Sequence, residues 1–481
     1  MKKFKTLVPY ILAILMCLFV AFPAISNSIV LDEAYSVYLV QGSVSDIIQG
    51  AAKDVHPPLY YLILKFFNLF GSESLFKYRL VTALGTWLNL LLIGATMVRK
   101  QWGCRTSVLY ILWFSLTYGT LEKTTLIRMY SWGAFFVTAA AVFIFLYYQN
   151  DRKRDLILGA VMTLAAMYTH YYALIAVFFI WLFLLLIVLC TKRERLGAVF
   201  PGGIAVTVGY LPWLGKLLAQ SRRVATNYWI SEFDWNEWKM VPAALMERSD
   251  DYAIGIGMVL YALLMIILLL AFVRKKWDSL LCVAVFVCTM LAGALLSVLV
   301  TPIWMTRYMY VGWGLIALFV AIMVGEVSSS YSNISQSLLI LVLAITGAVS
   351  LNTMLNDETI ANTADEWIDF LAENVESDSY IIIDDPNEHR LVYSFYLPDA
   401  ELVCTEKWHG REIEENLSKF LRQSSGHQLW YIVDYRQQKI GVERMKGYLN
   451  ELGYTTQSAG FYVIKQKELE IFRIEEMQND K

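Results

Sequence analysis

Charged residues are scarce in this sequence. Of its 481 residues only 17% are Asp, Glu, Lys or Arg, whereas 57% are hydrophobic, and the mean hydropathy is +0.48. Soluble domains carry roughly 25% charged residues, so this composition excludes a soluble chain. The apolar residues form runs of about 17–25, the length at which a helix crosses a bilayer. The sequence therefore predicts a polytopic α-helical membrane protein.

Patterns of metal and cofactor binding are also missing. The six cysteines form neither a disulfide framework nor a paired zinc spacing. No HExxH motif is present, and residues 357–481 lack a glycine-rich phosphate loop. We therefore expect no required cofactor and no nucleic-acid partner. A divalent metal is compatible with the acids and histidines of the chain, but their spacing does not indicate one.

The apolar runs predict eleven spans, and the basic segments between them predict their direction. "MKKFK", "RKQWGCR", "DRKRD", "TKRER" and "RKKWD" fall on one side when the spans are counted. Basic loops stay in the cytoplasm, so we expect a multi-pass cell-membrane protein with a cytoplasmic amino terminus. The predicted spans are 7–26, 80–98, 104–121, 129–148, 156–171, 173–190, 197–217, 253–273, 279–299, 307–325 and 337–355.

Charge and periodicity divide the chain near residue 356. Residues 1–356 carry 27 basic and 17 acidic side chains, whereas residues 357–481 carry 13 and 25. In the second part, β-like runs ("SYIIIDD", "ELVCT", "QLWYIVDY") alternate with amphipathic helical patterns ("ADEWIDFLAENV", "REIEENLSKFLRQ", "VERMKGYLNELG"). We expect a transmembrane domain, 1–356, followed by a small extracytoplasmic α/β domain, 357–481.

The predicted first external loop, 27–79, holds an unusual set of polar residues. Asp32 and Glu33 follow the first span, and Asp54 and His56 precede Pro57–Pro58. Proline stiffens a helix start, which would hold Asp54 and His56 in place. The loop also predicts helices along the membrane surface, with four aromatic residues in the interface belt: Tyr60, Tyr61, Phe66 and Phe67.

More ionisable residues fall at the same predicted outer boundary. They are Arg79, Glu122, Lys123, Arg128, His170 and Arg307. Each alone is explained by snorkelling or helix capping, and the loop acids alone by solvation. Together, cations beside carboxylates at one depth suit a lipid phosphate and a proton acceptor. The substrate would then be a sugar carried on a polyprenyl phosphate, with arginines stabilising the departing phosphate.

Several of these segments resemble a known superfamily. "LDEAY", "DVHPPLYYLILKFFNLFGSE" followed by Arg79, "THYYAL" and "RYMYVGWGLIAL" look like the GT-C membrane glycosyltransferases. The most similar group is the protein O-mannosyltransferase-like one (glycosyltransferase family 39), with the lipid A aminoarabinose transferases as relatives. The resemblance extends over roughly residues 1–320, and its specific part is the first 80 residues.

The resemblance implies a role for each matching residue. Asp32 matches the catalytic general base and Glu33 its neighbour, while Asp54 and His56 match an element that binds donor or acceptor. Arg307 and Tyr308 ("RY") resemble a position that meets lipid phosphate. Arg79, Arg128 and His170 are looser matches to substrate-binding positions. A short external turn, the lack of an MIR-type acceptor domain and the unfamiliar tail leave the acceptor open: a protein, a wall polymer or a glycolipid.

Two other classes of function compete with a transferase. A secondary transporter or flippase would fit eleven spans, but it places polar groups near the bilayer midplane and in repeated halves. Here the charges gather at one face, and no repeat between halves is visible. A sensor with an external α/β domain would leave the loop acids and outer cations without a role.

Overall fold

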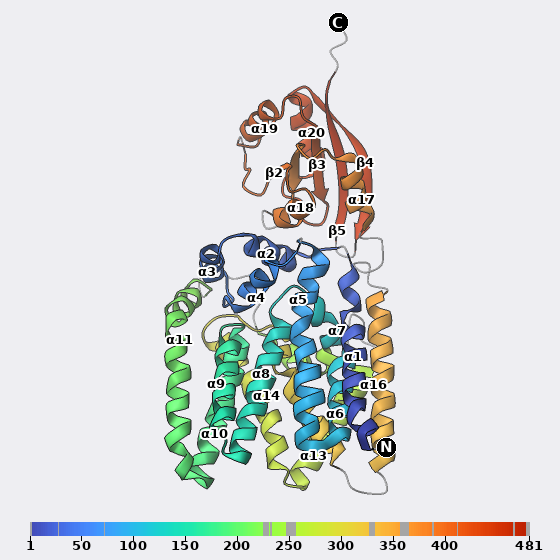
Figure 1. Ribbon diagram of the computed structural model, residues 1–481. Helices are drawn as coiled ribbons and strands as arrows, with labels where there is room; N and C mark the ends of the chain where they lie inside the picture. The colour runs from blue at the N-terminus through green and yellow to red at the C-terminus, as the bar shows by residue number, and fades with distance from the viewer. Residues whose placement is uncertain are drawn as a thin grey trace. The chain divides into compact units, whose positions relative to one another are not determined.

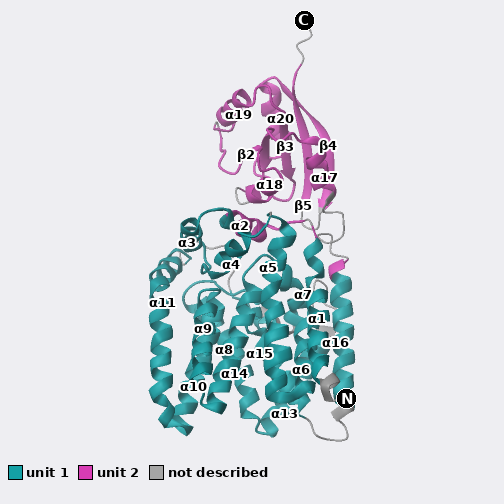
Figure 2. Ribbon diagram, in the orientation of Figure 1, with its two compact units in different colours: residues 1–25, 39–353 teal, residues 26–38, 354–481 magenta. Residues whose placement is uncertain are grey.

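The computed structural model describes residues 2–26, 28–71, 73–224, 230, 233–246, 256–326, 332–355, 365–386, 389–410, 412–464 and 467–477. They form two compact units (Figure 2). The helical unit comprises residues 1–25 and 39–353, and the sheet unit comprises residues 26–38 and 354–481. The boundary predicted near residue 356 falls among residues 356–364, which lie outside the described part of the chain.

The helical unit is a bundle of long helices with short helices at one end (Figure 1). Its elements are α1 (Lys2–Ala21), η1 (Phe22–Ile25), α3 (Val44–Lys53), α4 (Leu59–Asn68), α5 (Leu75–Leu88), η2 (Asn89–Val98), α6 (Arg99–Leu116), α7 (Tyr118–Thr125), α8 (Tyr130–Asn150), α9 (Lys153–Met167), α10 (Tyr171–Thr191), η3 (Arg193–Arg195), α11 (Leu196–Val224), α12 (Trp235–Met246), α13 (Ile256–Val273), α14 (Trp277–Leu299), η4 (Thr306–Gly312), α15 (Trp313–Gly325) and α16 (Ser332–Leu355). The helix α2 (Leu31–Gln41) continues from the sheet unit into the helical unit.

Each of the eleven predicted spans overlaps one or more helices of the described residues. Eight helical runs of the described residues are long and apolar enough to cross a membrane, and one of them, Leu75–Leu116, includes the predicted span 80–98 and most of the span 104–121. Its backbone turns at Gly103, where φ is 91°, a value that favours glycine. Past this turn α6 packs back on η2, and Ser107 Oγ donates to the Gly94 carbonyl at 2.7 Å. The remaining spans, at α9 and α13, are shorter helices.

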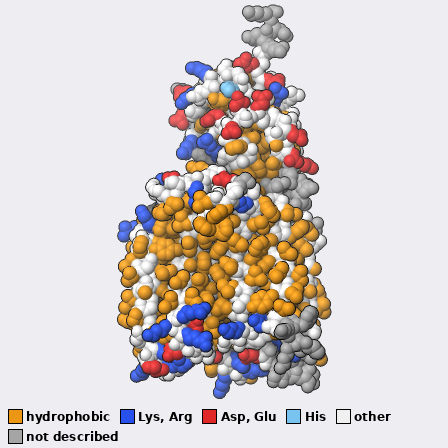
Figure 3. All heavy atoms as spheres, in the orientation of Figure 1, with side chains coloured by type: hydrophobic (Ala, Val, Ile, Leu, Met, Phe, Trp, Pro, Cys, Tyr) orange, Lys and Arg blue, Asp and Glu red, His pale blue; other side chains and the backbone are white. Residues whose placement is uncertain are grey.

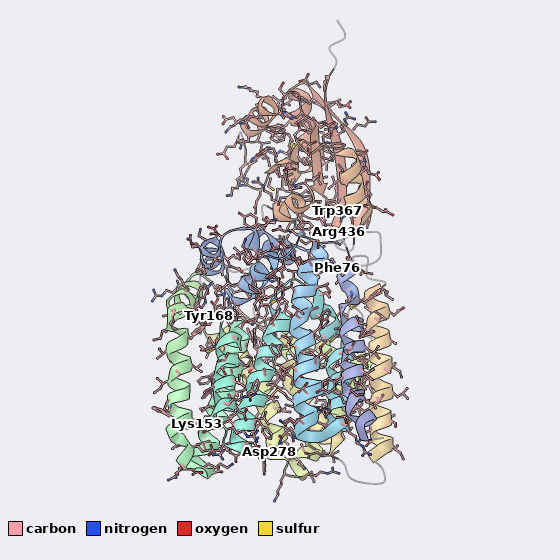
Figure 4. The ribbon with its side chains drawn as sticks, in the orientation of Figure 1. Phe76, Lys153, Tyr168, Asp278, Trp367 and Arg436 are labelled. Carbon is pink, nitrogen blue, oxygen red and sulfur yellow. The ribbon has the colours of Figure 1, made fainter. Side chains whose placement is uncertain are left out.

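The basic segments lie together at one end of the helical unit. Figure 3 shows Lys and Arg side chains gathered there, beyond an apolar band. Lys153 at the start of α9 and Asp278 at the start of α14 mark this end, whereas Tyr168, which follows α9, lies at the opposite end (Figure 4). We call these the basic end and the tyrosine end. The grouping agrees with the predicted topology, and its assignment to the cytoplasm stays an inference from the positive-inside rule.

Small and hydroxylated residues bring the helices of the bundle close together. A Cβ added at Gly85 of α5 would lie 2.6 Å from the backbone nitrogen of Trp132 on α8. Thr86 of α5 and Thr124 of α7 share a hydrogen bond of 3.0 Å, and Tyr310 donates to Thr120 at 3.2 Å. Close approach and interhelical hydrogen bonds hold membrane helices together, because lipid is as apolar as their side chains.

The tyrosines of α4 differ from the prediction. Tyr60 and Tyr61 are fully buried, so they do not belong to an interface belt, whereas Phe66 is exposed. Pro58 precedes the first residue of α4, and the helix then turns Tyr60, Tyr61 and Leu64 towards the interior of the unit. Tyr60 forms a hydrogen bond of 2.7 Å with Thr82 of α5. The buried phenols therefore anchor the segment that carries Asp54 and His56.

The sheet unit is an α/β domain with a five-stranded sheet of order β2-β1-β3-β5-β4. β1 is parallel to β2 and β3, and β5 pairs antiparallel with β3 and β4. Ile382, Tyr431 and Val433 of the sheet share a core with residues of α19 and α20. Its elements are α17 (Asp365–Asn374), β1 (Tyr380–Asp384), α18 (Arg390–Tyr396), β2 (Glu401–Cys404), α19 (Glu412–Gln423), β3 (Leu429–Asp434), α20 (Val442–Glu451), β4 (Tyr454–Ile464) and β5 (Lys467–Glu476).

The predicted strands and helices of the tail are confirmed, but the prediction lacked α18, β4 and β5. An unexpected member of the sheet unit is the segment Ser26–Tyr38. Its Ile29 backbone N–H donates to the Tyr396 hydroxyl of α18 at 2.8 Å. The start of α2 therefore belongs to the sheet unit although it is over 300 residues away in sequence.

Candidate functional site

The turn between α3 and α4 places a histidine between a carboxylate and a guanidinium. His56 Nδ1 lies 3.1 Å from Asp54 Oδ2 and 3.3 Å from Arg128 Nη2. His56 and Arg128 are buried. When Nδ1 carries a proton, His56 donates to Asp54, and Arg128 contributes its charge alone. The structure thus brings together three of the predicted site residues, from segments more than 70 residues apart.

The Asp54 carboxyl is held in its ionised form. Burial by itself raises its pKa, but the hydrogen bond from His56 and the positive charges of His56 and Arg128 outweigh burial and lower the pKa from 3.8 to about 2. The Tyr61 hydroxyl lies 3.4 Å from the same Asp54 oxygen, Oδ2. A carboxylate this acidic is a poor proton acceptor near neutral pH, and its contact with Nδ1 orients the His56 ring.

Residues near the end of α11 form hydrogen bonds with the connection between α3 and α4. Gln220 is buried, and its Nε2 lies 2.8 Å from the Ala51 carbonyl and 2.7 Å from the Asp54 carbonyl. Arg223 Nη2 donates to the same Asp54 carbonyl at 2.9 Å. The Gln220 carbonyl oxygen accepts from the Tyr171 hydroxyl at the start of α10. One glutamine therefore connects the α3–α4 turn with both α10 and α11.

Aromatic rings surround the buried His170. Its ring centroid lies 5.7 Å from His56, 5.7 Å from Tyr130 and 5.1 Å from Tyr308. Tyr172 completes the group, 5.3 Å from Tyr308. The Arg307 guanidinium carbon lies 5.8 Å from the Tyr308 ring. Predicted residues of three separate segments, His56, His170 and Tyr308 with Arg307, thus meet at the tyrosine end.

A cavity of about 310 Å³ opens beside these residues. Its walls are mostly apolar side chains of α10, α11 and α14, such as Leu217 and Leu296. The polar part of the lining comes from His56, His170, Gln220, Ser221, Thr301 and three tyrosines: Tyr171, Tyr172 and Tyr308. An apolar pocket with a few convergent polar groups is the usual form of a small-molecule or lipid site.

The remaining predicted residues occupy other elements. Asp32 and Glu33 lie in the first turn of α2, in the segment that groups with the sheet unit. The Val30 backbone N–H donates to Glu33 Oε2 at 3.3 Å, so Glu33 caps its own helix. Arg79 is buried on α5, one turn before the Thr82 that bonds Tyr60. The catalytic assignment of Asp32 and Glu33 stays a prediction.

Sequence reasoning missed Tyr61, Tyr130, Tyr172 and Gln220. For the tyrosines a signal was present: "HPPLYY", "RMY", "THYY" and "RYMY" each place tyrosine within five residues of a buried or half-buried cation or histidine. Repetition of that pairing in four segments indicates one shared aromatic and basic site. Gln220 has no such signal, because its partners lie 166 and 169 residues earlier in the chain.

In the sheet unit, the place where an α/β sheet usually binds a ligand is covered by a loop of the same chain. Open α/β sheets bind ligands beyond the carboxyl ends of their strands, where the strand order reverses, and here that point lies between β1 and β3. Asp384 at the end of β1 accepts backbone N–H groups of Lys439, Ile440 and Gly441 at 2.9–3.0 Å. The buried carboxylate thus fastens the chain's own loop over this point.

The described part of the chain contains no cluster of side chains that could ligate a metal ion. Among those residues no three His, Cys, Asp or Glu side chains lie close enough to hold an ion. Metal dependence therefore stays untested.

Comparison with solved structures identifies the fold of this chain, whereas comparison of sequences finds no match. No family model matches the sequence, and no curated protein matches it significantly. Among solved structures, ArnT from Cupriavidus metallidurans in the apo state superposes with a TM-score of 0.64 at 12% identity, over 96% of this chain and 97% of ArnT. ArnT bound to undecaprenyl phosphate gives 0.62, with the same identity and coverage. The chain has the GT-C fold.

A second GT-C structure is similar over part of its length. The arabinofuranosyltransferase AftD from Mycobacteria superposes with a TM-score of 0.52 at 13% identity, over 98% of this chain but 40% of AftD. In this chain the GT-C fold therefore consists of the helical unit together with one small α/β unit.

Proposed function

We propose that this chain is a membrane glycosyltransferase that moves a sugar from a polyprenyl-phosphate-linked donor to an acceptor hydroxyl on the extracytoplasmic face. The observation that carries the proposal is the cavity at the tyrosine end, where His56, His170 and Tyr308 line an apolar chamber. Arg128 and Arg307 supply positive charge beside it. The GT-C fold supports this proposal, and so does the ArnT structure that holds undecaprenyl phosphate.

The reaction would proceed by displacement at the anomeric carbon. The acceptor oxygen forms a bond to that carbon, while the bond from carbon to the phosphate oxygen breaks and its electron pair stays on the polyprenyl phosphate. The acceptor proton passes to a carboxylate, for which we propose Asp32, with Glu33 beside it. Asp54 is unsuited to that task, because its pKa of about 2 makes it a weak base.

The cations would stabilise the charge that grows on the leaving phosphate. Arg128 is buried and fixed beside His56, so its charge acts in a medium of low dielectric constant. Preorganised donors of this kind contribute the most to catalysis, because they need no rearrangement during the reaction. Arg307 and Tyr308 would bind the same phosphate, and Arg79 would support the site from α5.

Turnover by purified protein tests this proposal. The protein in lipid nanodiscs would be given a panel of polyprenyl-phosphate hexoses and pentoses, with candidate protein, wall-polymer and glycolipid acceptors. Release of free polyprenyl phosphate together with glycosylated acceptor is the expected result. Movement of intact lipid-linked sugar across a vesicle membrane, without cleavage, would instead identify a flippase.

The Asp32→Asn variant tests the proposed base. It should insert into the membrane as the unaltered protein does and lose sugar transfer. Lys153→Ala, at the basic end of the helical unit, is the matched control and should transfer sugar normally. Wild-type turnover by Asp32→Asn would remove Asp32 from the mechanism.

A further inference from the structure

His170 begins α10 as its N-cap residue. Its backbone is extended, with φ −155° and ψ 139°, and its Nδ1 accepts a hydrogen bond of 3.1 Å from the Tyr172 backbone N–H. A ring nitrogen that accepts a hydrogen bond carries no proton. The neutral imidazole therefore has its single N–H at Nε2, and the cap fixes this tautomer.

The Nε2 atom of His170 is a buried donor that lacks a protein acceptor among the described residues. Only 2% of the His170 surface is exposed, and His170 is one of the residues that line the 310 Å³ cavity. A buried donor without an acceptor destabilises the state that contains it. Such a donor at a cavity wall is satisfied when a bound molecule brings an acceptor oxygen.

The surroundings of His170 keep the ring neutral. Residues 168–170 connect α9 and α10 outside the apolar span that begins at Tyr171. Burial, and then the positive charges of His56, Arg128 and Arg307, lower the pKa of His170 well below 6.5. These three groups face the ring from the α3–α4 turn, the α7–α8 connection and η4.

We propose that His170 is a neutral hydrogen-bond donor to a phosphate oxygen of the lipid-linked substrate. The acceptor is assigned as phosphate because the same surroundings hold Arg128 and Arg307, which attract an anion. The arginines supply positive charge, whereas His170 supplies a hydrogen bond that orients the phosphate. The His170 proton stays on Nε2 throughout the reaction. The identity of the phosphate rests on the proposed function, but the tautomer does not.

Nitrogen NMR of ¹⁵N-histidine-labelled protein in nanodiscs tests the tautomer. The chain has five histidines, and His170→Asn identifies the His170 signals. We expect a protonated Nε2 and an unprotonated Nδ1 throughout the range of about pH 6–8. A proton on Nδ1, or titration near the ordinary histidine pKa, would overturn the proposal.

Adding undecaprenyl phosphate to the same sample tests the acceptor. The His170 Nε2 signal should shift as the phosphate binds, while His427, exposed in the sheet unit, should not. A wild-type protein that binds no undecaprenyl phosphate would overturn the phosphate assignment and the proposed function together, with the tautomer result unaffected. Binding without a shift at Nε2 would overturn the His170 assignment alone.

Affinity measurements separate the donor role from the cap role. Asparagine is a good N-cap residue, so His170→Asn keeps the cap and loses the donor at Nε2. We expect its thermal stability to match the wild type and its affinity for undecaprenyl phosphate to fall roughly 10- to 100-fold, as for a lost hydrogen bond to a charged group. His427→Asn is the control. Unchanged affinity in His170→Asn would show that His170 only caps α10.

Discussion

At the scale of single residues, Asp54, His56 and Arg128 form a charged row beside the cavity, which His56 lines. His56 Nδ1 lies 3.1 Å from the Asp54 carboxylate and 3.3 Å from the Arg128 guanidinium. The sequence indicated the three residues but not this order, because Arg128 comes from a different segment. The fold places Arg128, from a distant part of the sequence, in direct contact with His56, which itself contacts Asp54.

Asp54 should make the protein's stability depend on acid pH. Its pKa is lower in the folded protein, about 2, than the ordinary 3.8. The ionised carboxylate therefore stabilises the fold above about pH 4 by roughly 2 kcal/mol, and this contribution disappears as the pH falls through 2. Asp54→Asn should melt at a lower temperature than the wild type at pH 7 in detergent, and the difference should close between about pH 4 and 2. A pH-independent difference would contradict the ion pair.

Arg128 should matter for turnover more than for folding of the bundle. Arg128→Ala removes a buried charge beside the proposed phosphate site, and loss of one preorganised donor lowers kcat by roughly 100- to 1,000-fold. Arg128→Lys keeps the charge but not the planar guanidinium, and should recover part of the rate. Steady-state kinetics with a lipid-linked sugar donor give both values. Equal turnover by all three proteins would place the charge stabilisation elsewhere.

At the scale of elements, the apolar runs determined the helices, and tertiary contacts determined the rest. Runs of about twenty apolar residues are long enough to cross a bilayer as helices, which is why all eleven predicted spans overlap helices of the described residues. Six of the ten residues of strand β5, "KELEIFRIEE", are charged, and the segment becomes a strand by pairing with β3 on one side and β4 on the other. Pairing partners of that kind cannot be seen in a local pattern. The same is true of Gln220, whose contacts join α11 to the α3–α4 turn.

Gln220 should act on the site through the α3–α4 turn. Gln220→Leu leaves the Ala51 carbonyl without this donor and weakens the hold on the Asp54 carbonyl, at a cost of about 1–3 kcal/mol. We expect a lower melting temperature and slower sugar transfer, with Gln220→Glu intermediate because it keeps the acceptor for Tyr171. Lys216→Ala, an exposed position one turn earlier on α11, is the control. Wild-type kinetics in Gln220→Leu would show that the turn holds its shape without α11.

Two glycines offer a test of how closely α5 and α8 approach. A Cβ at Gly85 would lie 2.6 Å from backbone of α8, whereas a Cβ at Gly215 of α11 would meet nothing within 4 Å. Gly85→Ala should destabilise the protein by about 1–3 kcal/mol, and Gly215→Ala should be neutral or stabilising by up to about 1 kcal/mol. Unfolding in mixed detergent micelles measures both. Equal stability of the two variants would contradict the close approach.

At the scale of the whole molecule, the helical unit has two chemically different ends. Lys153 and Asp278 lie at the basic end, and the connection that carries Tyr168 and His170 lies at the tyrosine end. We expect the basic end to face the cytoplasm. On that expectation the cavity would open to the extracytoplasmic side, where the proposed donor is a lipid-linked sugar.

Cysteine labelling of whole cells should distinguish the two ends. In a cysteine-free background, Ser45→Cys at the exposed start of α3 should react with a membrane-impermeant maleimide. Lys153→Cys should react only after the cells are permeabilised. The opposite pattern would reverse the topology, and with it the side on which sugar transfer takes place.

The hold of α11 on Asp54 has a mechanical consequence. This helix runs for 29 residues, and its final turn clasps the carbonyl two residues before His56. If a bound acceptor or the bilayer tilted α11, its hydrogen bonds to the Asp54 carbonyl would move the nearby His56 imidazole as well. A molecule that binds elsewhere along α11 would therefore change the positions of Asp54 and His56 without contacting either residue.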